Sequence, residues 1–166
     1  MPLGSDDTVA LTGMMGSGKT TVSRLLGRLL GRRVVSTDAR LEALAGKPAA
    51  RVFAEDGERA FREAERAVVG QLAGPVVADL GGGAFCDPAS AERLLRVGAV
   101  VFLDVSPREA ARRLGSGAGR PLAGQWEELL RRRLPRYRRA SLRVEVDGLS
   151  PSAVARRVAD LLGATR

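Results

Sequence analysis

The chain has 166 residues, enough for one domain with a substantial core and too few for a second domain of ordinary size. No apolar stretch approaches the ~20 residues that span a bilayer, and the N-terminus lacks a basic segment followed by an apolar one, so we expect a cytoplasmic protein without a membrane span. One cysteine, Cys86, excludes an internal disulfide and a cysteine-based zinc site, and the absence of histidine leaves general-base chemistry to a carboxylate.

The net charge of +8 comes almost entirely from arginine, because Lys19 and Lys47 are the only lysines. Such a charge is compatible with a nucleic-acid partner, but aromatic residues make up only 4% of the chain and offer no platform for stacked bases. Guanidinium groups also suit small anions, since they bind phosphate and carboxylate in a bidentate way. We therefore expect small anionic ligands and no nucleic acid.

The first expected elements are a strand at about 8–12 and a helix at about 19–30, and residues 13–20 between them read GMMGSGKT. This loop fits the pattern G-x-x-x-x-G-K-[ST] at every specified position. Its glycines let successive N–H groups turn toward a β-phosphate, Lys19 can reach the β- and γ-phosphates, and the Thr20 hydroxyl can hold Mg²⁺. The alternative is a glycine-rich turn with a surface lysine, but chance matches are rare in this strand–loop–helix context.

A short second strand opens at Val34-Val35 and ends at Ser36-Thr37-Asp38, which places the Asp38 carboxylate at the carboxyl edge of the sheet. In open α/β sheets this is the edge at which ligands bind. Asp38 could also cap the N-terminus of a helix at about 39–44, and the two roles are compatible.

Two amphipathic helices are expected at about 48–55 and 58–72, and Arg62 lies close to the apolar face of the second. Spacing alone indicates a solvated arginine or one paired with an acid a turn away. A buried parallel strand at 75–80 runs directly into three glycines at 81–83. Consecutive glycines cost backbone entropy, so we expect a ligand to approach the main chain closely there.

The rest of the chain continues the alternation of helix and strand. The expected elements are a helix at 87–97, a strand at 99–103, a helix at 106–114, a glycine-rich segment that resembles a lid at about 115–124, a helix from 126 to at least 134, a strand at 142–147 and a helix at 151–163. This alternation predicts an α/β fold in three layers, with a parallel sheet covered on both faces.

With these pieces in place, the sequence resembles the shikimate kinase family. The motifs that carry the resemblance are GSGKTT at 16–21, Thr37-Asp38, Asp56-Gly57-Glu58 with Phe61, Arg62 and Glu65, the glycines at 81–83, Arg120-Pro121-Leu122, and Arg133 with Pro135 and Tyr137. The resemblance implies one P-loop kinase domain over residues 1–166, with a five-stranded parallel sheet in the order 2-3-1-4-5. It also implies a substrate-binding helical region at about 38–72 and transfer of the ATP γ-phosphate to the shikimate 3-hydroxyl in aromatic amino acid biosynthesis.

The resemblance also implies a role for individual residues. The nucleotide-binding residues would be Gly16, Ser17, Gly18, Lys19, Thr20, Thr21, Arg113, Arg120 and Pro151. The substrate-binding residues would be Asp38, Arg62, Glu65, Gly81, Gly82, Gly83 and Arg133. Among these, Lys19, Asp38 and Arg120 would be catalytic, with Arg120 closing on the phosphates, Arg62 and Arg133 clamping the shikimate carboxylate, and Glu65 holding an arginine of that clamp.

One position departs from the family pattern. Many members carry Asp-x-Asp where this chain has Ser36-Thr37-Asp38, so an acid that supports Mg²⁺ is missing. An extra acid, Asp79, ends the strand at 75–80, where many phosphate-loop proteins carry the acid that organises Mg²⁺. We expect Thr20 and Asp79 to hold the metal, and the alternative is that Asp79 caps the glycine turn through backbone N–H groups.

Two other functions compete with this one. A related kinase could act on another polyol, such as gluconate or a cyclitol, although Arg62, Arg133 and the three glycines favour a rigid cyclic carboxylate. A catalytically silent relative that only binds nucleotide is the second alternative, and the intact Lys19 and Thr20 argue against it. The expected partners are ATP and shikimate, with Mg²⁺ as cofactor, and the expected oligomeric state is a monomer.

Overall fold

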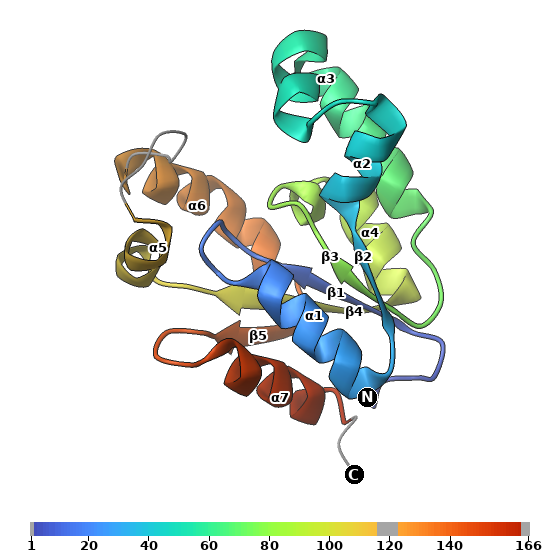
Figure 1. The fold of residues 1–166 in the computed structure, drawn as a ribbon, viewed down its shortest axis with the longest axis vertical. Helices are drawn as coiled ribbons and strands as arrows, with labels where there is room; N and C mark the ends of the chain where they lie inside the picture. The colour runs from blue at the N-terminus through green and yellow to red at the C-terminus, as the bar shows by residue number, and fades with distance from the viewer. Residues whose placement is uncertain (1, 116–122, 164–166) are drawn as a thin grey trace.

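The computed structural model describes residues 2–115 and 123–163. Its five strands are β1 (Thr8–Thr12), β2 (Arg33–Ser36), β3 (Val76–Asp79), β4 (Gly98–Asp104) and β5 (Leu142–Glu145). All neighbouring strands pair in parallel, and their order is β2-β3-β1-β4-β5 (Figure 1). The strand order expected from the sequence is therefore confirmed.

Seven α-helices and one short 3₁₀ helix surround this sheet in the described residues. They are α1 (Lys19–Leu30), α2 (Thr37–Ala45), α3 (Ala49–Gly70), η1 (Ala84–Cys86), α4 (Pro88–Val97), α5 (Pro107–Leu114), α6 (Ala123–Tyr137) and α7 (Pro151–Leu161). Figure 1 shows α1 and α7 side by side along the sheet, α2 and α3 above its carboxyl edge, and α5 and α6 beside the phosphate loop. None of the helices in these described parts is long and apolar enough to cross a membrane.

Local sequence signals place most helix ends correctly. Gly31 ends α1 in the left-handed conformation, and Asp87 caps α4 by accepting a bond from the Ser90 N–H. The alternative that Asp38 caps α2 is wrong, because the helix already begins at Thr37 and the Ser36 side chain accepts the bond from the Ala39 N–H. Asp38 lies inside the first turn, and its carboxylate is not used as the cap.

Other boundaries differ from the sequence expectation. The two helices expected at 48–55 and 58–72 are both present within α3, where Gly57 separates them with a non-helical φ of 89° and ψ of 164°, but the second ends at Gly70. The turn η1 was not predicted, and α6 begins at Ala123, so residues 123 and 124 of the expected lid are helical. Gly115 of that lid caps the end of α5, and residues 116–122, with Arg120, lie outside the described residues.

Candidate active site

The phosphate loop lies at the carboxyl end of β1 and lines a cavity of about 650 Å³. Gly16 and Gly18 have φ values of 86° and 88°, a left-handed conformation that glycine adopts at little cost. Five of the expected nucleotide-binding positions of the loop line this cavity: Gly16, Gly18, Lys19, Thr20 and Thr21. Ser17 does not, because its side chain is buried beneath the loop and its N–H donates to the Met14 carbonyl over 3.2 Å.

Lys19 lies with its ammonium group against the loop. Its Nζ donates to the Gly13 carbonyl at 2.8 Å and to the Met14 carbonyl at 3.2 Å. Burial lowers the pKa of Lys19 to about 8, while the charges of Asp79 and Asp38 oppose this shift. Asp79 and Asp38 thus stabilise the charge of the ammonium, and the two carbonyls that accept its hydrogen bonds are acceptors that a phosphate group can replace.

Thr20 and Asp79 form a direct pair beside Lys19. The Thr20 hydroxyl donates to Asp79 Oδ2 at 2.8 Å, and Asp79 is 9% exposed. The glycine turn is capped by another residue, because the Gly81 N–H donates to the Thr37 hydroxyl at 2.9 Å. The capping role considered for Asp79 therefore falls to Thr37.

A second cavity, of about 280 Å³, adjoins the first and is formed by α2, α3, α6 and the glycine turn. Asp38, Gly81 and Gly82 line both cavities. Burial raises the pKa of the Asp38 carboxyl, and the nearby charge of Asp79 raises it further, whereas Lys19 acts in the opposite direction. A carboxylate thus stands where the two cavities meet.

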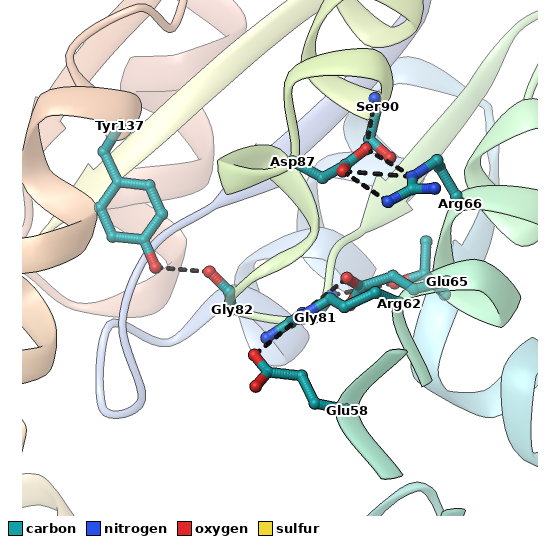
Figure 2. A network of polar contacts seen from close by, with 10 residues as sticks. Glu58, Arg62, Glu65, Arg66, Gly81, Gly82, Asp87, Ser90 and Tyr137 are labelled. Carbon is teal, nitrogen blue, oxygen red and sulfur yellow. Dashed lines mark hydrogen bonds and ion pairs between the residues drawn. The ribbon is translucent and has the colours of Figure 1, made fainter. Parts of the chain in front are cut away.

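Two guanidinium groups line the second cavity, that of Arg62 on α3 and that of Arg133 on α6. Arg62 Nη1 donates to Glu65 Oε1 at 2.7 Å, and Figure 2 shows Arg62 between Glu58 and the buried Glu65. The expected contact between Glu65 and an arginine is confirmed. Arg133 is half-buried, and no carboxylate in the described parts of the chain lies within ion-pair distance of it. Its charge therefore remains available to an anion.

The three glycines of the turn leave room for these same side chains. A Cβ atom built on each glycine would lie 2.5 Å from Asp38 Oδ1 at Gly81, 2.8 Å from Arg133 Nη1 at Gly82 and 2.6 Å from Arg62 Nη1 at Gly83. None of the three has a positive φ, so backbone strain does not explain them. The sequence predicted that a ligand approaches the main chain of this turn closely. In the structure, three polar side chains that line the cavity approach it closely.

Of two other predicted nucleotide-binding residues, one lines the phosphate cavity and the other does not. Arg113 lines the phosphate cavity, and its Nη1 donates to the Gly16 carbonyl at 3.2 Å. Pro151 begins α7 and is not among the described residues that line this cavity.

Sequence reasoning assigned no role to Trp126 or Tyr137, which also contact this site. Trp126 Nε1 donates to the Met15 carbonyl at 3.0 Å, and the Tyr137 hydroxyl donates to the Gly82 carbonyl at 2.6 Å (Figure 2). The only signal for either residue in the sequence was that Tyr137 belongs to a family motif.

A phosphate loop beside a second cavity that two arginines line defines the class of this protein. It is a P-loop kinase that acts on a small molecule, because the phosphate site shares the Asp38 wall with the second cavity.

Comparison with known proteins identifies the family. The family model for shikimate kinase matches residues 15–162. A shikimate kinase of Salinispora arenicola is 45% identical over 163 residues, covering 93% of this chain and 96% of the relative, and one of Mycobacterium avium is 41% identical over 164 residues, covering 93% of each chain. The structure of shikimate kinase from Acinetobacter baumannii in complex with shikimate has a TM-score of 0.88 at 30% identity and covers 95% of this chain and 93% of its own. This chain belongs to the shikimate kinase family.

Proposed function

We propose that this enzyme transfers the γ-phosphate of ATP to the 3-hydroxyl of shikimate. The observation that carries the proposal is the position of Asp38, which lines both the phosphate cavity and the cavity with the two arginines. A carboxylate at this junction can accept a hydrogen bond from an acceptor hydroxyl that faces the γ-phosphate. The raised pKa of Asp38 makes it a better proton acceptor than an ordinary aspartate while leaving it ionisable.

We assign the binding of the carboxylate of shikimate, the phosphoryl acceptor, to Arg62 and Arg133. Glu65 fixes the Arg62 guanidinium, whereas Arg133 has no acidic partner in the described residues and provides the uncompensated charge. Two planar donors suit a carboxylate because each guanidinium can form paired N–H···O bonds. Arg62, Arg133 and the glycine turn together favour a rigid cyclic carboxylate over a flexible chain, so gluconate is the weaker candidate.

Mg²⁺ is assigned to Thr20 and Asp79, and the residues present fit such an ion. A hydroxyl and a buried carboxylate lie 2.8 Å apart at the edge of the phosphate cavity, and oxygen donors are those that Mg²⁺ prefers. When bound, the ion supplies positive charge to the β- and γ-phosphate oxygens. Ser36 lies opposite Asp79 in the β2–β3 register, so Asp79 stands beside the position at which the family pattern carries an acid.

Lys19 completes the phosphate site. Its ammonium can exchange the Gly13 and Met14 carbonyls for phosphate oxygens, which stabilises the negative charge of the transferring group. Arg120, expected to act on the same phosphates, lies outside the described residues and stays a prediction. A cytoplasmic location and a monomeric state also belong to this proposal as predictions.

A coupled assay of ADP release tests the function. Shikimate, quinate and gluconate are offered at equal concentration with saturating MgATP, and the product with shikimate is identified by phosphorus NMR. We expect turnover with shikimate at least ~100-fold above that with gluconate, because gluconate also carries a carboxylate for the two arginines but its open chain does not hold one hydroxyl at a fixed distance from that carboxylate. Equal turnover with gluconate, or ADP release that no acceptor stimulates, would refute the proposal.

A further inference from the structure

Helix α6 carries two buried aromatic side chains that donate hydrogen bonds to backbone carbonyls outside the helix. Trp126 is 4% exposed and donates to Met15, and Tyr137 is fully buried and donates to Gly82. Buried Trp and Tyr side chains usually find a partner for their polar atom. The unusual feature is that one partner belongs to the phosphate loop and the other to the glycine turn of the second cavity.

At the phosphate loop, the contact fixes the orientation of one peptide unit. The Met15–Gly16 bond is planar and trans, so its N–H points away from its carbonyl. Because Trp126 holds the carbonyl, the N–H of the same peptide is fixed on the other side of the bond, and it belongs to Gly16, which lines the phosphate cavity. The Met15 side chain is 43% exposed and contributes little packing of its own. The indole is therefore the main tether of this peptide on the α6 side.

At the glycine turn, Tyr137 acts together with an arginine four residues earlier in the same helix. The Tyr137 ring stacks on Phe102 at a centroid distance of 4.9 Å, which fixes its hydroxyl beside the Gly82 carbonyl. Arg133 lies against the Cα of the same glycine, and its Nη1 also approaches Met14 Sδ at 4.0 Å. Gly82 is thus held at its carbonyl by Tyr137 (Figure 2), and Arg133 of the same helix occupies the space that a Cβ on Gly82 would need.

We propose that Trp126 and Tyr137 are positioning residues that hold the phosphate loop and the glycine turn at a fixed separation through α6. The two residues are eleven positions apart, about 16 Å along an α-helix, and one continuous helix sets their separation, with Pro135 confined to its last turn. Trp126 sets the nucleotide side and Tyr137 sets the acceptor side. This inference rests on the proposed function only for the identity of the acceptor.

The test removes each donor without changing the shape of the ring. Trp126 is the only tryptophan, so growth of a tryptophan auxotroph on the benzothiophene analogue of tryptophan replaces the indole N–H by sulfur at this position alone. Tyr137→Phe removes the other donor from the same helix and serves as the matched control. Calorimetry then measures the dissociation constants of MgADP and of shikimate separately, and thermal unfolding measures stability.

We expect opposite selectivity in the two variants. The sulfur analogue should weaken MgADP about 2- to 12-fold, the loss of one net hydrogen bond, and leave shikimate within twofold. Tyr137→Phe should weaken shikimate by a similar factor and leave MgADP within twofold. Trp126→Phe is the second variant if the analogue does not yield folded protein, and it should show the same preference for MgADP.

Other outcomes would overturn the inference. Unchanged affinities with a lower melting temperature would show that the two bonds only stabilise the fold. Equal weakening of both ligands by either variant would show that the two bonds do not act separately on the nucleotide site and the acceptor site. If the wild-type enzyme failed to bind shikimate, the proposed function and the acceptor half of the inference would fall. The MgADP measurement would still decide the role of Trp126.

Discussion

One methyl group at Gly82 is expected to weaken acceptor binding without unfolding the protein. A Cβ at this position lies 2.8 Å from Arg133 Nη1, whereas ordinary contacts begin near 3.4 Å, so the guanidinium must retreat by about 0.6 Å. The φ of Gly82 is not in the left-handed region, so alanine adds no backbone strain. The clash is with the tip of a flexible side chain, and the fold can therefore absorb it.

The cost of Gly82→Ala should appear in the Michaelis constant for shikimate. A hydrogen bond to a charged group contributes about 1.5–3 kcal/mol, and a shift of this size removes much of its alignment. If ~1–2 kcal/mol is lost, the Michaelis constant for shikimate rises about 5- to 30-fold. The constant for ATP should stay within twofold, because the displaced group belongs to the acceptor cavity.

Gly98→Ala is the matched control for Gly82→Ala. A Cβ at Gly98 would lie 1.9 Å from the Thr8 carbonyl oxygen, which belongs to the neighbouring strand and cannot move without breaking the sheet. This variant should melt at a much lower temperature or fail to fold, whereas Gly82→Ala should melt within a few degrees of the wild type. An unchanged Michaelis constant for shikimate in Gly82→Ala would show that the position of Arg133 is not set by this glycine, and the clamp geometry would have to be abandoned.

Four further changes test the other groups of the site. Lys19→Ala should abolish phosphoryl transfer with an unchanged circular dichroism spectrum, and activity within about threefold of the wild type would remove Lys19 from the mechanism. Arg133→Lys should raise the Michaelis constant for shikimate more than that for ATP, because an ammonium cannot replace a bidentate fork, and the reverse pattern would move this arginine to the nucleotide site. Asp79→Asn should need ~10–100-fold more Mg²⁺ for half-maximal rate, whereas an unchanged requirement with a lower melting temperature would make the acid structural. An ordinary aspartate becomes protonated near pH ~4, and the raised pKa of Asp38 predicts that this residue is protonated at a higher pH. As the pH is lowered, kcat/KM for shikimate should therefore begin to fall before pH ~4 is reached. A profile that stays flat down to that pH would contradict the role of Asp38 as the proton acceptor.

The fold could be predicted from the sequence because its signals are local or belong to contiguous motifs. Apolar periodicity gives the helices, buried runs give the strands, and residues such as Gly31 and Asp87 mark helix ends within a few positions of where they act. The strand order came from the family resemblance. The alternative that Asp38 caps α2 was wrong because Ser36 and Asp38 are both good capping residues, and only the backbone conformation shows which of them lies outside the helix.

The candidate site could be predicted as a set of residues but not as a set of contacts. The resemblance named Asp38, Arg62, Glu65 and Arg133, and the structure brings all four to one cavity. The resemblance did not indicate that each of the three glycines lies against a different one of these side chains. Contacts from a side chain to a distant backbone leave no periodic trace in the sequence, and Trp126 and Met15 are separated by 111 positions.

The distribution of arginine shows why composition alone could not locate the site. The high positive charge suggested small anionic ligands, yet in the described residues only Arg62, Arg113 and Arg133 line the two cavities. Many of the others pair with acids on helix surfaces, as Arg59 does with Glu63 one turn away, and such exposed pairs contribute little to stability. A site for an anion needs a cation that the protein itself leaves uncompensated. Arg133 meets this condition because α6 turns it toward the glycine turn, away from the acids of its own surface, and that property belongs to the folded chain and not to its charge count.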